Sequence, residues 1–219
     1  MMPPAAIVTD IEGTTTPISF VHRVLFPYAR ERMAAFVATN HPALADVPEP
    51  RLETLLGWMD GDEKITALKT IQGIIWAEGY ESGALIGEVY EDVAPALKRW
   101  ARAGLRLYVY SSGSVAAQRL LFGHSSAGDL NPLFQANFDT RVGPKREAAS
   151  YGAIARGIGL TAGEVLFLSD IEAELDAAAQ AGLKTCQLVR ANDGTLASTR
   201  HVTAADFGEV AAAFGLARG

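Results

Sequence analysis

The sequence AAIVTDIEG, residues 5–13, sets a short apolar segment directly before two acidic residues. The same pattern, an apolar segment that ends in polar or acidic residues, recurs at 106–110 (RLYVY) and 165–169 (VLFLS). Short, nearly continuous apolar segments are typical of strands that are buried on both faces of a parallel sheet. Residues 185–189 (TCQLV) predict one more strand of this kind.

Helical patterns separate these strands. They cover residues 86–103, 115–122, 145–157 and 171–181, and a last helix is expected from about 204 to 216 after a polar loop at 192–203. Strands that alternate with helices predict an α/β fold with a doubly wound, mainly parallel sheet. Ligands of such folds bind at the carboxyl ends of the strands.

One interval lacks convincing strands. Residues 16–90 hold only helical patterns, chiefly 19–39, where Pro27 predicts a kink, and 65–78. We therefore predict a helical domain at 16–90, inserted after the first strand of a core formed by 1–15 and 91–219. The aromatic residues of the insertion are more typical of its core than of a substrate pocket: Phe20, Phe26, Trp58, Trp76 and Tyr80.

Composition limits the class of protein. Of 219 residues, 49% are hydrophobic and 20% charged, as in ordinary globular proteins. The net charge of −6 and the absence of a basic run make nucleic acid an unexpected partner. Cys186 is the single cysteine, which excludes an intramolecular disulfide and favours a reducing compartment. No apolar run reaches the roughly 18 residues of a membrane helix, so we expect a cytoplasmic protein that does not bind membranes.

The first candidate site follows the first strand. Asp10 and Glu12 lie one residue apart where a buried strand reaches the ligand face of the sheet. A carboxylate at this place can attack phosphorus, and a second acid can protonate the leaving oxygen and then activate water. Asp10 is thus the candidate nucleophile and Glu12 the candidate acid/base. The structural alternative is that Asp10 only starts a turn or caps a helix.

The second candidate site is the serine-rich turn at 111–114 (SSGS), which lies between a strand and a helix. Main-chain N–H groups and hydroxyls at such a turn can hold a phosphate at the start of a helix. Ser111 and Ser112 are therefore candidate phosphate ligands. The alternative is that these serines only cap the helix.

Lys145 is the third candidate, and the pattern places it at the start of the helix 145–157. A cation there opposes the helix macrodipole, so a phosphate or the carboxylate of Asp10 is expected to hold it. A solvated surface lysine is the alternative.

The fourth candidate site is Asp170, with Glu174 one helical turn further on. If Asp10, Glu12 and Asp170 converge, each pair of carboxylates near 4 Å repels by about 4 kcal/mol at an effective dielectric constant of about 20. A cation must offset this repulsion, and hard oxygen ligands favour Mg²⁺ over zinc. Asp170 and Glu174 could instead be acids that stabilise a helix start.

The histidines do not form a metal site in the sequence, because they show no ligand spacing and no paired nucleophile: His22, His41, His124 and His201. Their expected roles are structural.

The four candidate sites, in this order, resemble the four motifs of the haloacid dehalogenase-like superfamily, in which the insertion after the first motif is a mobile cap. The resemblance narrows to the acireductone synthase family, the enolase-phosphatases of methionine salvage. It rests on DIEGTTTPISFVHRVLFPYAR, LKTIQGIIWAEGYESG, YSSGSVAAQRLLFGHS, FDTRVGPKREAASY and FLSDIEAELDAA. It implies a monomer with one Mg²⁺ that enolises 2,3-diketo-5-methylthiopentyl-1-phosphate and then releases phosphate to give acireductone.

Carried over by position, the resemblance implies that Asp10, Glu12 and Asp170 are metal-site residues. Ser111 and Ser112 would contact the substrate phosphate, and Lys145 would bind substrate. Glutamate at position 12 departs from the aspartate that is usual in superfamily phosphatases but is typical of the narrower family.

Three alternatives stay open. They are another magnesium-dependent small-molecule phosphatase on the same scaffold, a haloacid dehalogenase, and a phosphoacceptor signalling module. A dehalogenase needs no metal and no acid at position 12, and a signalling module lacks the helical insertion.

Overall fold

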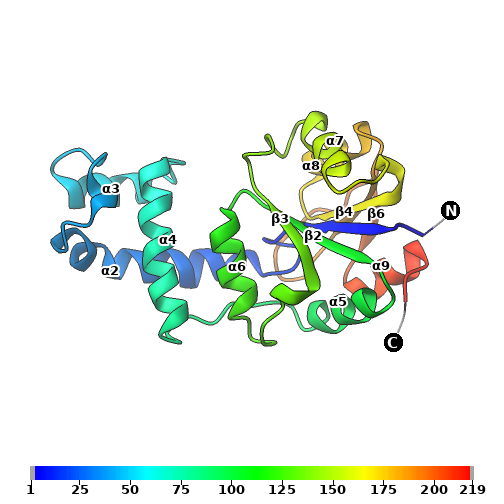
Figure 1. Cartoon of the computed structure of the whole chain (residues 1–219), viewed down its shortest axis with the longest axis horizontal. Helices are drawn as coiled ribbons and strands as arrows, with labels where there is room; N and C mark the ends of the chain where they lie inside the picture. The colour runs from blue at the N-terminus through cyan, green and yellow to red at the C-terminus, as the bar shows by residue number, and fades with distance from the viewer. Residues whose placement is uncertain (1–2, 218–219) are drawn as a thin grey trace.

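The computed structural model describes residues 3–217, and its centre is a six-stranded sheet with the strand order β3-β2-β1-β4-β5-β6. Figure 1 shows this sheet in one half of an elongated molecule. Every neighbouring pair of strands is parallel, which confirms the predicted α/β class. The strands are β1 (Ala6–Thr9), β2 (Arg106–Tyr110), β3 (Phe134–Phe138), β4 (Val165–Ser169), β5 (Lys184–Leu188) and β6 (Val202–Ala204).

The central strands β1 and β4 are buried along their whole length. Successive side chains of a strand point to opposite faces, so such a strand must be apolar at every position. In β1, Ile7 packs into one hydrophobic cluster with Trp100, whereas Val8 packs into another with Tyr151. Burial on both faces explains why these strands were visible as apolar segments in the sequence.

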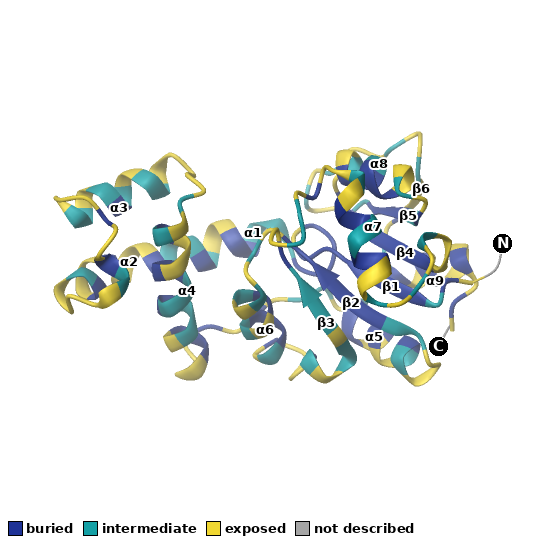
Figure 2. Cartoon of the chain, turned by 45° about the horizontal axis from the view of Figure 1, so that its top comes forward, coloured by how far each residue is buried: buried dark blue, intermediate teal, exposed yellow. Residues whose placement is uncertain are grey.

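Helices cover both faces of the sheet. On one face, α5 (Val93–Arg102) and α9 (Phe207–Phe214) bury their apolar sides, and on the other face α7 (Ala148–Gly157) and α8 (Glu172–Gln180) do so. Figure 2 shows the buried strands between these half-exposed helices. The chain therefore forms the doubly wound arrangement in which ligands bind at the carboxyl ends of the strands.

The chain between β1 and β2 adds no strand to the main sheet in residues 16–90. It holds α1 (Ile18–Phe20), a π-helical turn (Val21–Leu25), α2 (Phe26–Ala38), a 3₁₀ turn (Pro42–Leu44), α3 (Arg51–Asp60) and α4 (Thr66–Glu81). Figure 1 places α2, α3 and α4 in the half of the molecule away from the sheet. These helices share a hydrophobic cluster of their own, which includes Met33, Leu55 and Ile71. The division into domains at 16 and 90 stays a prediction.

Pro27 coincides with a change in helix type. The predicted continuous helix at 19–39 is divided into α1, the π-helical turn and α2, and Pro27 is the second residue of α2. Proline has no N–H to donate to the preceding turn, so a regular α-helical bond cannot form there. Among residues 3–217, no helix combines the length and apolar character needed to span a lipid bilayer.

The two edge strands and α3 were not predicted. The β3 sequence FQANF is only half-buried, and β6 occupies part of the stretch 192–203 that was expected to be a loop. An edge strand has one neighbouring strand and meets solvent, so its sequence carries little apolar signal. Their place in the sheet follows from pairing with β2 and β5.

Besides α9, which starts at Phe207 rather than at about 204, two predicted helices begin later than expected. Residues 86–92 are not helical, because Gly87 N donates to His124 O at 2.8 Å and Tyr90 N donates to Thr15 O at 3.0 Å. These tertiary main-chain contacts replace helical bonds. The other helix, α7, starts at Ala148, so Lys145 lies in the preceding turn and the prediction that it opens the helix is wrong.

Candidate active site

The residues that the sequence singled out meet at one cavity. Its volume is about 140 Å³, and it lies at the carboxyl end of the central strands. Its lining includes all seven of them: Asp10, Glu12, Ser111, Ser112, Lys145, Asp170 and Glu174. Segments more than 150 residues apart in the chain therefore supply one site.

The sheet brings these side chains together. Asp10 follows β1, Ser111 follows β2 and Asp170 follows β4, and these three strands are neighbours in the sheet. Asp10 N donates to Leu168 O at 2.8 Å, so the pairing of β1 with β4 continues up to the first acidic residue. Parallel strands end at the same edge, which is why the three strand ends share a cavity.

The turn after Asp10 is tightly bonded. The main-chain N–H groups of Thr15 and Thr16 both donate to Ile11 O at 2.9 Å, and Gly13 N donates to Thr16 O at 2.8 Å. Gly13 adopts a positive φ of 68°, and a Cβ at this position would lie 2.6 Å from Cγ of Asp170. A glycine is therefore required both for the turn and for the close approach of Asp170.

Lys145 is held by two carboxylates. Its Nζ lies 2.8 Å from Asp10 Oδ1 and 2.6 Å from Glu174 Oε2, and its side chain is only 8% exposed. Burial alone would lower the lysine pKa, but the charges of Asp10 and Glu174 outweigh it and raise the pKa to about 12. Lys145 is therefore a cation in contact with the candidate nucleophile. It is not the solvated surface lysine that the sequence left possible.

The acidic groups of the cavity repel one another. Burial, followed by the charge of Asp10, raises the pKa of Asp170 to about 7. The same two causes raise the pKa of Glu174 and of Glu12, although solvent reaches Glu12 through the cavity. Lys145 offsets only part of this negative charge, so the site favours a further cation.

A divalent cation fits these residues. Asp170 Oδ1 is buried and accepts no hydrogen bond within residues 3–217, and a buried acceptor of this kind needs a partner. In the same part of the chain, no three His, Cys, Asp or Glu side chains stand close enough to hold an ion by themselves. Asp10 and Asp170 would therefore share an ion with other oxygens, as Mg²⁺ with its water ligands allows.

The serines of the turn at 111–114 have different roles, because one caps the following helix and two others line the cavity. Ser114 Oγ accepts from Ala117 N at 3.2 Å and caps α6 (Val115–Gly123). Ser111 Oγ accepts from Gly113 N at 3.2 Å, and Ser112 is exposed at the cavity surface. Ser111 and Ser112 are thus not the helix caps, and within residues 3–217 neither hydroxyl donates to a protein group, so both can donate to a ligand.

A larger cavity of about 570 Å³ adjoins this site. Glu12, Ser111 and Ser112 line both cavities. The wall of the larger one is mostly apolar and includes Val21, Leu25, Phe26, Trp58, Trp76 and Leu121. A ligand whose phosphate end lies at the serines can therefore extend an apolar tail between the helical segment and the sheet.

The interpretation of the aromatic residues as core is confirmed for Phe20 and Tyr80, which are buried in a hydrophobic cluster. Phe26, Trp58 and Trp76 pack against core clusters but also line the larger cavity, as Tyr80 does. Periodicity identifies the face of a helix that is turned inward. It does not distinguish a packed interior from a cavity wall.

Polar residues of the cavity were also missed. His22, Lys64 and Gln72 line the larger cavity, and the charges of His22 and Lys64 act to lower the pKa of Glu12. His22 and Gln72 lie in two of the segments that carry the family resemblance, 10–30 and 68–83, and Lys64 lies in the loop before α4. The resemblance did not single out these side chains, and His22 was expected to be structural.

Arg190, which follows β5, was missed as well. It is 5% exposed, and its Nη2 donates to Thr14 O at 2.7 Å in the turn after β1. Its Nη1 pairs with Asp92 at 2.9 Å, and its guanidinium lies 4.1 Å from the ring centre of Tyr90. Arg190 therefore fixes the turn that carries Asp10 and Glu12.

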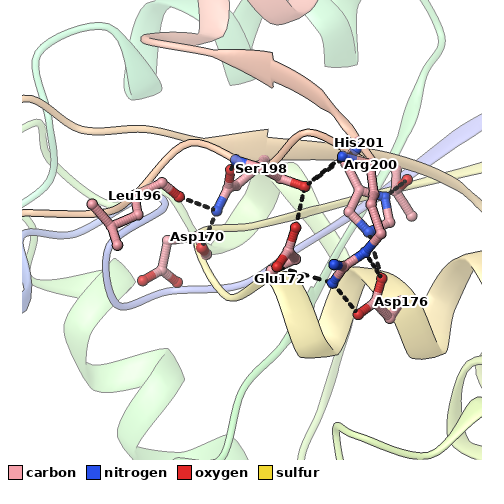
Figure 3. Close-up of polar contacts among 9 residues, drawn as sticks. Asp170, Glu172, Asp176, Leu196, Ser198, Arg200 and His201 are labelled. Carbon is pink, nitrogen blue, oxygen red and sulfur yellow. Dashed lines mark hydrogen bonds and ion pairs between the residues drawn. The ribbon is translucent and has the colours of Figure 1, made fainter.

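Gln187 in β5 links the stretch after Arg190 to the main chain of Asp170, and Figure 3 shows Leu196, Ser198 and Asp170 in this network of polar contacts. Gln187 Nε2 donates to Asp170 O at 2.9 Å and to Leu196 O at 3.1 Å, and its Oε1 accepts from Ser198 N at 2.6 Å. The hydroxyl of Ser198 donates to Glu172 at the start of α8. The predicted loop is thus bonded to the strand end that carries Asp170.

His201 has the structural role that was expected. Its Nε2 lies 3.0 Å from Asp176 Oδ1, and its Nδ1 lies 2.8 Å from Thr185 Oγ1 (Figure 3). Arg200 adds ion pairs to Asp176 at 2.7 Å and to Glu172 at 2.9 Å. These contacts join the stretch before β6 to α8.

Comparison with known proteins agrees with this geometry. Residues 4–182 match the family model described as haloacid dehalogenase-like hydrolase. Enolase-phosphatase E1 of Granulibacter bethesdensis is 58% identical over 99% of each chain. The crystal structure of the UTR4 protein of Saccharomyces cerevisiae is 37% identical, covers 93% of this chain and 98% of its own, and has a TM-score of 0.83.

A more distant structure shares only the fold. CbbY of Rhodobacter sphaeroides, solved in complex with phosphate, is 17% identical, covers 97% of this chain and all of its own, and has a TM-score of 0.68. The family match over most of the chain and the full-length relatives lead to one conclusion. The chain belongs to the haloacid dehalogenase-like hydrolases and, within them, to the enolase-phosphatase E1 family.

Proposed function

We propose that the enzyme enolises 2,3-diketo-5-methylthiopentyl-1-phosphate and then hydrolyses the enol phosphate to acireductone and phosphate, as part of methionine salvage. The observation that carries this proposal is that Glu12, Ser111 and Ser112 line both cavities. One substrate molecule can thus bind with its phosphate beside Asp10 and with its apolar methylthio end in the larger cavity. The names of the relatives support the same reaction.

Phosphate release uses Asp10 as the nucleophile. Its carboxylate oxygen forms a bond to phosphorus while the bond from phosphorus to the ester oxygen breaks, which gives an aspartyl phosphate. Lys145, 2.8 Å from Asp10 Oδ1, and the hydroxyls of Ser111 and Ser112 hold the phosphoryl oxygens. Water then attacks the aspartyl phosphate and regenerates the carboxylate.

Glu12 acts as the acid and base of both steps. The raised pKa of Glu12 suits a group that gives a proton to the leaving enol oxygen and then accepts one from the attacking water. In the preceding enolisation, its carboxylate removes a proton from the carbon that bears the phosphate ester. The side chain of a glutamate is one methylene longer than that of an aspartate, which lets it reach this carbon as well as the ester oxygen.

We assign Asp10, Glu12 and Asp170 to the site of one Mg²⁺ per chain, in which the side chains of Asp10 and Asp170, together with other oxygens such as those of water, would hold the ion. The unpaired Oδ1 of Asp170 and the hard oxygen ligands of the cavity support this assignment. When bound, the ion acts as a Lewis acid toward oxygens of the substrate. Glu174 supports the site by holding Lys145. We also propose a monomer that works in the cytoplasm, on the resemblance of its motifs.

The test is incubation with the diketo phosphate and Mg²⁺, with ultraviolet absorbance of the enol species and phosphate release followed together. Asp10→Asn should abolish phosphate release and let the enol phosphate accumulate, whereas Glu12→Gln should slow both steps. Asp46→Asn, at an exposed aspartate that lines neither cavity, is the matched control and should leave both signals unchanged.

Three outcomes would contradict parts of the proposal. Phosphate release by Asp10→Asn within tenfold of the wild type would remove Asp10 as nucleophile. Wild-type release of phosphate from other monoesters at a higher kcat/KM, without any enol signal from the diketo phosphate, would favour another magnesium-dependent phosphatase. Full enolisation by Glu12→Gln would require a different base, and His22 lines the adjoining cavity.

A further inference from the structure

Gln72 is a buried polar residue without a protein partner. It lies in α4, is 6% exposed and lines the larger cavity. Its carboxamide makes no hydrogen bond with a group in residues 3–217, and its polar atoms are not among the fully buried atoms there that lack a partner. The amide therefore faces the cavity, where its donor and acceptor groups can bond a ligand.

Gln118 shows what a structural glutamine looks like in the same cavity. It is 2% exposed and also lines the larger cavity. Its Nε2 donates to Gly113 O and Phe138 O, both at 2.8 Å, and its Oε1 accepts from Asn137 Nδ2 at 3.1 Å. Two glutamines with similar burial therefore differ in one respect, because only Gln118 is fully bonded within the protein.

On α4 the cavity wall around Gln72 includes Lys69, Trp76 and Tyr80. Trp76, one helical turn further along α4, is its neighbour on the same face. The indole Nε1 of Trp76 already donates to Leu25 O at 2.8 Å, and its ring stacks on Phe26 at 6.4 Å between centroids. Among the cavity-lining residues of α4 between Lys69 and Tyr80, Gln72 is thus the one whose donor is not already used within residues 3–217.

We infer that Gln72 is a substrate-recognition residue whose Nε2 donates a hydrogen bond to a carbonyl oxygen of the bound diketone. This inference rests on the proposed function. Glu12, Ser111 and Ser112 fix the phosphate end where the two cavities meet. The two carbonyls then lie between this end and the apolar tail, and carbonyl oxygens only accept hydrogen bonds.

Donation by Gln72 also suits the chemistry of enolisation. Removal of a proton beside a carbonyl places negative charge on the carbonyl oxygen, and a fixed donor stabilises that charge. An apolar side chain at position 72 would leave the oxygen unpaired in an apolar cavity, which weakens recognition of the diketone in particular. A phosphate ester without carbonyls would lose nothing.

The experiment compares two non-hydrolysable phosphonates that share the methylthio chain, one with the two carbonyls and one with methylenes in their place. Their dissociation constants are measured by calorimetry, with Mg²⁺, for the wild type, Gln72→Met and Gln72→Glu. The wild type should bind the dicarbonyl compound about tenfold to a hundredfold more tightly. Both variants should lower this ratio to about one, because methionine and an ionised glutamate have no donor.

A structural role predicts different results. Gln118→Met should lower Tm, since the carbonyls of Gly113 and Phe138 lose their donor, whereas Gln72→Met should keep Tm within about 2 °C of the wild type. An equal loss of Tm in both variants, a preserved affinity ratio in Gln72→Met or Gln72→Glu, or an equal loss of affinity for both phosphonates would each overturn the inference. Turnover of the diketo phosphate by the wild type tests the proposed function separately.

Discussion

The carboxylate of Asp193 accepts a hydrogen bond from the hydroxyl of Tyr90. The same carboxylate lies 3.4 Å from Ile18 N, at the start of α1. Ile18 and Tyr90 lie at the two connections between the sheet and the helical segment, so one side chain after β5 contacts both. Burial and then the bond to Asp193 raise the pKa of Tyr90, which keeps its hydroxyl protonated as a donor.

The first prediction is that Tyr90 and Asp193 are energetically coupled. A double-mutant cycle with Tyr90→Phe and Asp193→Asn should give a coupling free energy of about 1–2 kcal/mol in urea unfolding, because the bond has a charged acceptor. Phenylalanine keeps the ring on which Arg190 lies. The cycle of Tyr90→Phe with Asp46→Asn, which share no contact, should be additive within about 0.5 kcal/mol. Additivity in both cycles would contradict the coupling.

The second prediction concerns Gly13, where φ is 68° and a Cβ would lie 2.6 Å from Asp170. Gly13→Ala should displace the carboxylate of Asp170 and raise the Mg²⁺ concentration for half-maximal activity at least tenfold. Gly83→Ala is the matched control, because Gly83 has a φ of 76° and open space around it. The control should lose about 1 kcal/mol of stability through backbone strain alone. An unchanged metal titration in Gly13→Ala would disprove the steric account.

The third prediction is that Lys145 stabilises the fold through its ion pairs. Lys145→Met leaves the carboxylates of Asp10 and Glu174 buried without a cation and should lower the free energy of unfolding by about 3–5 kcal/mol without Mg²⁺. Adding Glu174→Gln should recover part of the loss. Lys98→Met, at an exposed lysine, should change stability by less than about 0.5 kcal/mol. A similarly small change in Lys145→Met would refute the role of the pairs.

The fourth prediction is a pH dependence of Mg²⁺ binding. The pKa of Asp170 is raised to about 7, so the metal-free protein should lose stability as pH rises from about 4 toward 7, where this buried group ionises. Mg²⁺ binds the ionised form, and its stabilising effect should therefore grow over the same range. Thermal unfolding at several pH values, with and without Mg²⁺, measures both trends. Asp170→Asn should reduce them, and a Mg²⁺ effect that is equal at pH 5 and pH 7.5 would contradict the assignment.

The sequence alone determined the class of fold. Strands β1, β2 and β4 are buried in the middle of the sheet, and burial on both faces demands the continuous apolar segments that made them visible. The edge strands β3 and β6 have no such requirement, because solvent takes the place of one neighbour. Their sequences therefore carried no signal, and their positions follow from pairing with β2 and β5.

The sequence also determined which residue types form the candidate site. Asp10, Ser111 and Asp170 each follow a predicted strand directly, and parallel strands end at one edge, so their convergence follows from local pattern and topology. Lys145 was selected through its motif, although the helix that it was expected to open begins later, at Ala148.

Only the tertiary structure decided which other side chains line or support this site. Gln72 lines the larger cavity, whereas Arg190 and Asp193, which carry no motif, act through contacts with segments far away in the chain. Arg190 reaches Thr14 across 176 residues of sequence, and Asp193 reaches Tyr90 across 103. The periodicity of apolar residues indicates whether a side chain is turned inward. The packing of the helical segment on the sheet decides whether that side chain then contacts another residue or lines a cavity.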